Sequence, residues 1–205
     1  MRYSSDHKAQ TRTRVLTEAA AAIRTDGVDR VSVARIMSRA GLTHGGFYAH
    51  FSSKDDMITQ AVGFMFENRY GAFFGRPDQP DPASVLSRFI DWYLSINHRD
   101  MPDRGCPIPL LSGQAALLPE GAFSRFVLAT ERLTATIESL LREMDHEHPE
   151  VTAAVVIAEM MGGVAMSRLQ RDDEKAGNLL DAIRTSVRAS CGLPPSDREA
   201  KPVRA

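Results

Sequence analysis

The sequence predicts an all-α protein, on the strength of three observations. Apolar residues recur at helical spacing along most of the 205-residue chain, as they do in helices with one buried face. The alternation of apolar and polar residues that marks half-buried strands is absent. Glycine, serine and proline fall between the periodic segments, where they end one helix or begin the next. We expect about nine helices, with a three-helix N-terminal domain joined by a long helix to a C-terminal helical domain.

The composition restricts the class of protein. The chain is 43% hydrophobic and 25% charged, which is ordinary for a soluble globular protein. Its two cysteines, Cys106 and Cys191, lie too far apart in sequence for a CxxC metal site and are too few for a disulfide framework. The polar N-terminus does not resemble a signal peptide, and no apolar run approaches the ~18 residues of a membrane span. We therefore expect a soluble, cytoplasmic protein.

Charge is distributed unevenly. Residues 1–54 carry nine Lys/Arg and four Asp/Glu, a net charge of +5, whereas the remainder carries −6. A basic first quarter on an acidic body is typical of a polyanion-binding end. A solvated basic helix face would show the same asymmetry, so charge alone does not decide between the two.

The first two expected helices are bounded by clear signals. Residues 7–26 form the first, and Gly27 ends it. Ser32 is placed to cap the second, which Gly41 ends as a left-handed C-terminal residue. The expected buried residues of these two helices are Val15, Ala19, Ala22, Ile23, Ile36, Met37 and Ala40.

The next two helices follow closely. Thr43 is placed to cap a short helix that runs to about His50. Ser52 or Ser53 then caps a long helix that runs to about Phe74, and each has an aspartate three residues on, as in a capping box. The expected buried residues of the long helix are Met57, Ile58, Ala61, Val62, Met65 and Phe66.

A break rich in proline and glycine, "GRPDQPDP" at 75–82, separates these helices from the C-terminal ones. The expected C-terminal helices are one near Val85 to Ile96, a short one at about 109–117, and longer ones at 120–144, 149–170 and 173–190. Helix 149–170 is apolar almost all round and begins with proline, which suits the first helical position. A polar tail, 193–205, is expected to be disordered.

A short second helix, a turn at 41–43 and a third helix form the layout of a helix-turn-helix, whose recognition helix enters the DNA major groove. Gly45 and Gly46 then lie at the start of the recognition helix, where glycine costs about 1 kcal/mol each relative to alanine. They can let the backbone approach the bases closely, allow tight packing inside the domain, or do both.

The stretch "GLTHGGFYAHFSSKDDMI" resembles the signature of the TetR family of bacterial transcriptional regulators, and the resemblance covers about residues 8–62. It implies that Tyr48, His50 and Lys54 contact DNA phosphates, with Ser32 or Arg35 added from the second helix. It also implies that the start of the recognition helix faces the base edges. That start comprises Thr43, His44, Gly45 and Gly46. Phe47, Phe51, Val31, Val33, Ile36 and Leu42 are expected to pack the core of this domain.

The resemblance divides the chain into a DNA-binding domain at 1–54, a ligand-binding and dimerisation domain at 55–192, and the tail. It implies a homodimeric repressor that binds a palindromic operator in double-stranded DNA. The dimer would form through helices 149–170 and 173–190, since the first of these cannot bury its apolar residues within one small subunit. Gly162, Gly163 and nearby alanines would allow close helix approach.

The resemblance to the TetR family also implies a small effector, largely apolar, bound in the C-terminal domain. Its candidate contacts are Phe89, Trp92, Tyr93, Cys106, Leu110, Phe123, Phe126 and Met160, although such residues are more often ordinary core. Cys106 has basic neighbours in sequence that would make its thiol reactive, which leaves a redox- or electrophile-responsive regulator open. A buried, inert cysteine is the simpler interpretation.

The sequence shows no catalytic constellation, and we expect no enzyme activity, no cofactor and no metal site. His146 and His148 in "MDHEHPE" more often belong to a solvated turn than to a metal site. A helical interaction module that does not bind DNA remains the alternative from a different functional class.

Overall fold

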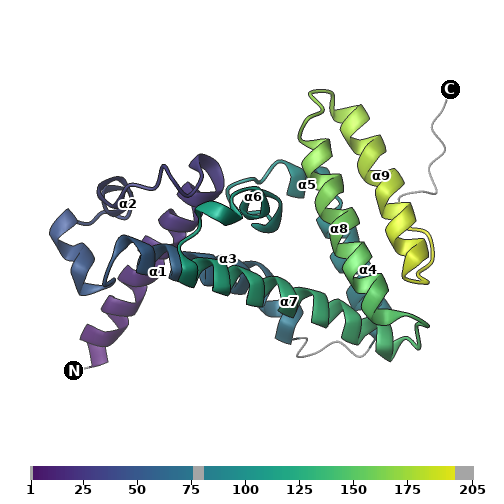
Figure 1. Cartoon of the computed structure of the whole chain (residues 1–205), viewed down its shortest axis with the longest axis horizontal. Coiled ribbons are helices and arrows are strands. Elements are labelled where there is room, and N and C mark those ends of the chain that lie inside the picture. Colours follow the sequence, from purple (N-terminus) through teal and green to yellow (C-terminus); the bar gives the residue numbers. More distant parts are fainter. Residues whose placement is uncertain (1, 76–80, 197–205) are drawn as a thin grey trace. The chain divides into compact units, whose positions relative to one another are not determined.

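The computed structural model describes residues 2–75 and 81–196, and within these ranges all regular secondary structure is helical (Figure 1). The expectation of an all-α fold is confirmed. In chain order the elements are α1 (Arg2–Asp26), α2 (Val33–Arg39), the 3-10 helix η1 (His44–Ala49), α3 (Lys54–Gly75), α4 (Pro82–Tyr93), α5 (Ile96–Arg99), α6 (Ile108–Gly113), the 3-10 helix η2 (Ala115–Leu117), α7 (Glu120–Glu143), α8 (Pro149–Ser167) and α9 (Asp173–Ser190).

The chain forms two compact units. Unit 1 comprises residues 1–69 and 102–130, and unit 2 comprises residues 70–101 and 131–205. The helices α3 and α7 each contribute residues to both units. The functional division expected at residues 54 and 192 stays a prediction. Most of the proline-rich break (76–80) and the end of the expected tail (197–205) lie outside the described residues.

The first two helices of unit 1 form as their sequences predict. Val15, Ala19 and Ile23 on α1 are fully buried, and so is Met37 on α2. The Ser32 hydroxyl accepts a hydrogen bond from the Arg35 N–H and thereby caps α2. Both glycine stops, at 27 and 41, have positive φ, the conformation that glycine adopts without strain.

The segment expected to be the recognition helix, here called the recognition segment, is η1 with Thr43 before it and His50 after it. It differs from the expectation in two ways. It is a 3-10 helix, with i to i+3 hydrogen bonds such as Gly46 N–H to Thr43 O (3.1 Å) and His50 N–H to Phe47 O (2.9 Å). Thr43 stands at the N-cap position, but its side chain accepts no capping hydrogen bond, so the predicted cap is wrong. Two adjacent glycines and an absent cap both weaken an α-helix, which is consistent with the tighter, shorter form.

The start of α3 resolves the choice between the two serines. Ser53 is the cap, because its hydroxyl accepts a hydrogen bond from the Asp56 N–H at 3.0 Å. The Asp56 carboxylate in turn accepts from the Ser52 N–H at 2.8 Å, and from the Ser52 hydroxyl. In a standard capping box the Asp56 carboxylate would accept from the N–H of Ser53, and here it accepts from that of the preceding residue, Ser52. These hydrogen bonds hold residues 52 and 53, between η1 and α3, against the first turn of α3.

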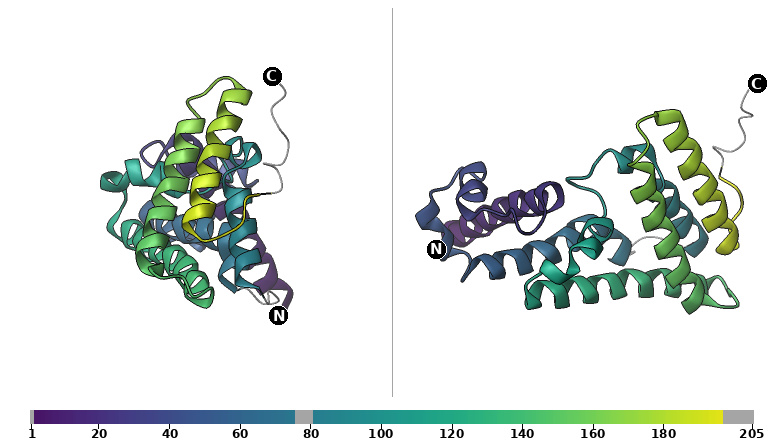
Figure 2. Two further views of the ribbon diagram at one scale, coloured as in Figure 1. Left: turned by 90° about the vertical axis from the view of Figure 1, so that its right-hand side faces the viewer. Right: turned by 45° about the horizontal axis from the view of Figure 1, so that its top comes forward.

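In unit 2, α8 and α9 run antiparallel and side by side, as both views of Figure 2 and the contacts between them show. Pro149 occupies the first turn of α8 and Asp172 caps α9. A buried arginine, Arg188, donates to both oxygens of Asp91 at 3.0 Å and to the carbonyl of Pro194 at 2.7 Å. This arginine therefore holds the segment after α9 against α4.

The composition of α8 corrects one sequence expectation. Within the described part of the chain, α8 has the length and hydropathy of a membrane span, although no apolar run of that kind was expected. Eight of its residues are buried in unit 2, as in the core helix of a globular domain. Its other side remains apolar and exposed: Val151, Val155 and Met166 are 60%, 52% and 53% exposed.

Candidate nucleic-acid interface

The outer surface of η1 consists of residues that make little contact with the rest of unit 1. Tyr48 is 72% exposed, and Thr43, His44 and Gly45 are also exposed. On the inner side of the same segment, Phe47 and Phe51 are 2% exposed each, and their rings stack with centroids 5.5 Å apart. The expected core role of these two phenylalanines is confirmed. One side of η1 thus anchors the segment, and the other side is available to a partner.

The glycine pair is not needed for packing. A Cβ built on Gly45 meets no atom within 4 Å, and one built on Gly46 meets Met37 and Thr43 only at 3.8 Å, an ordinary van der Waals contact. Neither glycine has the positive φ that would require its conformational freedom. Tight internal packing is therefore not what requires glycine at these two positions. Close approach of the backbone to DNA stays a prediction.

His50, at the end of η1, is not a satisfied core histidine. It is half-buried, and its Nδ1 is buried without a hydrogen-bond partner in the described part of the chain. Whichever ring nitrogen carries the proton, Nδ1 makes no hydrogen bond within the described residues. Burial, and then the charges of Lys8 and Arg12, lower the pKa of His50 below its ordinary value. An anion near the ring would raise the pKa of His50.

Arg12 on α1 holds the end of η1 in place, and no pattern in the sequence indicates this contact. Its guanidinium donates to the His50 carbonyl at 2.7 Å and to the Gln60 side chain, and it lies 5.1 Å from the centroid of the Phe51 ring. Gln60 in turn donates to Asp56 at 2.7 Å. The hydrogen bonds from Gln60 and Ser52 lower the pKa of Asp56. We call Arg12, Gln60 and Asp56 the bracing network.

Three more candidate residues surround this segment. Lys54 is exposed and is the first residue of α3. Ser32 is exposed, with its hydroxyl already used as the cap of α2. Arg35 is exposed and forms an ion pair with Asp26 at 3.1 Å. An exposed ion pair of this kind is worth at most about 1 kcal/mol, so Arg35 can exchange it for a phosphate.

Lys8 is a further exposed cation that sequence reasoning did not single out. It lies on α1, and its charge acts on His50. Together with Tyr48, His50 and Lys54, it gives the exterior of η1 a border of cationic and hydrogen-bonding groups. Such a border can position phosphates, and the glycines can lie against base edges.

The eight expected ligand contacts fall into two groups. Phe89, Trp92, Tyr93 and Met160 belong to unit 2, and Cys106, Leu110, Phe123 and Phe126 to unit 1. In unit 2, Phe89 stacks on Phe73 with ring centroids 4.2 Å apart, within a larger aromatic cluster. In unit 1, Phe123 is 44% exposed. Their role in binding a ligand stays a prediction.

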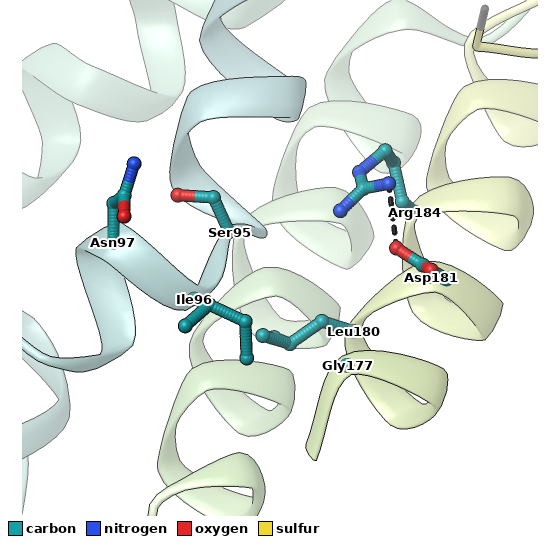
Figure 3. Close-up of a pocket in the computed structure, with 7 residues that line it drawn as sticks. All are labelled: Ser95, Ile96, Asn97, Gly177, Leu180, Asp181 and Arg184. Atoms are coloured by element: carbon teal, nitrogen blue, oxygen red, sulfur yellow. Dashed lines mark ion pairs between the residues drawn. The ribbon is translucent and has the colours of Figure 1, made fainter. Parts of the chain in front are cut away.

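One pocket in unit 2 involves none of these eight residues. It lies between Ser95 with the start of α5 and the helix α9 (Figure 3). Sequence periodicity could not indicate it, because it depends on contacts between segments about 85 residues apart.

The comparisons with known proteins concern the N-terminal region and the fold. Residues 15–61 match the model of the bacterial regulatory proteins of the tetR family. A comparison with proteins of curated function finds no match.

Solved structures match over most of the chain. The Escherichia coli NemR structure, described as a reduced form, has a TM-score of 0.75 at 16% identity and covers 88% of this chain and 96% of that one. A TetR family regulator from Agrobacterium tumefaciens scores 0.74 at 18% identity, with 87% and 98% covered. A TetR regulator from Chloroflexus aurantiacus scores 0.75 at 22% identity, with 90% and 95% covered. At these identities the structural matches establish the fold.

Three findings therefore converge: the helix-turn-helix layout with its exposed recognition segment, the family model over that same region, and the fold shared along most of the chain. The described chain has the fold of solved TetR-family transcriptional regulators, and its residues 15–61 match the model of the bacterial regulatory proteins of the tetR family.

Proposed function

We propose that the protein is a cytoplasmic, homodimeric repressor that leaves a palindromic operator when a small, largely apolar ligand binds to its C-terminal domain. The observation that carries the proposal is the exterior of η1. Two glycines there have no packing role, and a border of cationic and hydrogen-bonding groups surrounds them. The domain division at residues 54 and 192 belongs to the same proposal.

In this proposal Thr43, His44, Gly45 and Gly46 face base edges, and Tyr48 and His50 donate to phosphates. Lys54, Arg35 and Ser32 add phosphate contacts from α3 and α2. His50 would use its Nε2 for this contact, because its Nδ1 is buried without a partner in the described residues. The bracing network would hold the donors in register with the backbone of the duplex.

The homodimer is proposed to form through α8 and α9. One recognition segment makes few base contacts, and a two-fold dimer presents two of them about 34–36 Å apart, or a multiple of that distance. Val151, Val155 and Met166 supply an exposed apolar face on α8, and such faces commonly mark interfaces. Gly162 leaves open space for a partner helix. Val155→Glu should convert the dimer to a monomer in sedimentation equilibrium.

The ligand is proposed to contact the eight residues predicted from the sequence. It would act by a population shift, binding more tightly to a form whose recognition segments are wrongly spaced for the operator. A ligand that does so must stabilise the free protein and weaken operator binding in the same concentration range. A panel of apolar compounds in a thermal-shift assay, followed by operator-release assays, tests this.

A thiol-responsive regulator is the second candidate. It is favoured by the similar NemR structure, which is described as a reduced form of that protein. Cys106 is 4% exposed, which protects its thiol from bulky reagents. Cys191 is a poorer candidate, because burial raises its pKa to about 12. The test adds N-ethylmaleimide to the wild type and to the Cys106→Ser variant, each bound to the operator. If it releases the wild type but leaves the Cys106→Ser variant bound, the thiol mechanism replaces the ligand mechanism.

The decisive experiment is selection of random DNA duplexes on the purified protein, with the double variant Tyr48→Phe/Lys54→Ala beside it. We expect an enriched palindrome with the wild type and loss of enrichment with the variant. Wild-type affinity should also fall steeply with salt, since phosphate contacts release counterions. A folded dimer that enriches no sequence at low salt would refute DNA recognition and leave the helical interaction module as the function.

A further inference from the structure

Unit 2 contains a pocket of about 240 Å³ between two segments that are distant in sequence. Ser95, Ile96 and Asn97 line one side, and residues of α9 line the other, as Figure 3 shows. Its volume is below the roughly 300–1,000 Å³ of drug-sized sites, so it suits a small molecule. None of the residues proposed above to contact DNA or the apolar ligand lines it.

The inner end of the pocket holds a buried cation with unused hydrogen-bonding capacity. Arg184 is 2% exposed, and its Nη2 donates to the carbonyl of Leu94. Its Nε and Nη1 have no hydrogen-bond partner within the described residues. Buried polar groups nearly always have partners, and a buried guanidinium with free N–H groups is costly to the fold. An acceptor that enters the pocket would satisfy it.

The carboxylates near Arg184 do not fill that role. Asp91 lies 3.8 Å from the Arg184 Nε, beyond hydrogen-bond distance, and both of its oxygens accept from Arg188. Asp181 lies 2.7 Å from Nη1, but without the alignment of a hydrogen bond, and its side chain is 57% exposed. Figure 3 shows Asp181 beside the guanidinium at the edge of the site. Asp181 is the exposed partner of this pair and Arg184 the buried one, so the Asp181 carboxylate can turn into solvent when another anion takes its place.

Gly177 leaves space in the pocket beside the guanidinium. It lies inside α9, where glycine costs about 1 kcal/mol relative to alanine. A Cβ on Gly177 would meet no atom within 4 Å, so no neighbour in the described structure requires glycine there. Together with Leu180 and Ile96, it leaves an apolar floor of the pocket uncovered.

We propose that this pocket binds a small organic acid, with the acid's carboxylate on Arg184 in place of Asp181 and its short apolar body over Gly177, Leu180 and Ile96. A carboxylate supplies two acceptor oxygens to the fork of guanidinium N–H groups. The proposal does not depend on DNA binding, because the site lies wholly in unit 2 and is tested on the free protein.

The test is calorimetric titration of the full chain with hexanoate and with hexanamide, which has the same length and no charge. We expect hexanoate to bind and hexanamide to bind at least about tenfold more weakly, because charge-assisted hydrogen bonds are roughly twice as strong as neutral ones. Equal binding of the two, or no binding of hexanoate at millimolar concentration, would overturn the proposal.

Two variants locate the site without removing Arg184. Gly177→Leu fills the pocket and should abolish hexanoate binding, whereas Asn178→Leu places the same side chain on an exposed neighbour outside the pocket and should not. Asp181→Asn removes the competing carboxylate and should tighten hexanoate binding several-fold, with Glu174→Gln as its matched control. Binding that survives Gly177→Leu, or that Asp181→Asn leaves unchanged or weaker, would overturn the proposal.

Discussion

Arg12→Ala should loosen the recognition segment without removing a phosphate contact. The substitution deletes the charged hydrogen bond to the His50 carbonyl, a class of bond worth about 1.5–3 kcal/mol. It also deletes the contact with the Phe51 ring, worth about 0.5–1 kcal/mol at an exposed site. Because Arg12 is only half-buried, we expect about 2 kcal/mol in total, or a fall in Tm of roughly 4–8 °C for a protein of this size.

Operator binding distinguishes a bracing role from direct contact. With Arg12→Ala, affinity should fall about tenfold at every salt concentration, so the slope of log affinity against log salt stays at its wild-type value. Lys54→Ala, by contrast, should reduce that slope by about 1. Arg14→Ala is the matched control, since Arg14 lies on the same helix and its side chain donates to Thr11, at 3.4 Å, and not to η1 within the described residues. A lowered slope with Arg12→Ala, or an unchanged Tm, would refute the bracing role.

Three further predictions concern the folded state and pH. Gly163→Ala should destabilise the protein by about 1–3 kcal/mol in urea unfolding, because its Cβ would lie 2.8 Å from Ile183; Gly162→Ala, in open space, should not, unless the partner copy in the dimer packs there. The pKa of His50 is lowered in the free protein and should rise near phosphate, so operator affinity should increase as pH falls below about 6.5; His50→Gln should remove this dependence in fluorescence anisotropy titrations. Gln114→Ala removes the acceptor of the Val28 N–H and should cost about 1 kcal/mol in the same unfolding assay.

Much of unit 1 could be predicted because its signals are local. Gly27 and Gly41 end their helices because each adopts a positive φ, which depends on that one residue. Ser32 caps α2 through a hydrogen bond to a residue only three positions away in sequence. The apolar spacing identified the buried side of α1 and of α3 for the same reason. The prediction for Thr43 was wrong because a capping residue needs an α-helix to cap, and the glycines that follow favour the 3-10 form instead.

The bracing network and the pocket could not be predicted, because both depend on tertiary contacts. Arg12 reaches across 38 residues to His50, and its sequence neighbours give no hint of a partner. Arg184 looks like an ordinary helix-surface arginine in the sequence, yet it is 2% exposed. Helical periodicity assigns charged residues to the outside by default, so buried arginines are the residues that it misplaces.

The open space around Gly45 has an evolutionary consequence. Since no described atom lies within 4 Å of a Cβ at that position, a new side chain there would leave the packing of the domain unchanged. Phe47, two residues on, is fully enclosed and tolerates no such freedom. Under the proposed function, a duplicated copy of this protein could acquire a different operator preference through a single substitution and still fold. Selection on binding and selection on folding would then act on separate residues, which lets the targets of such regulators diverge while their architecture persists.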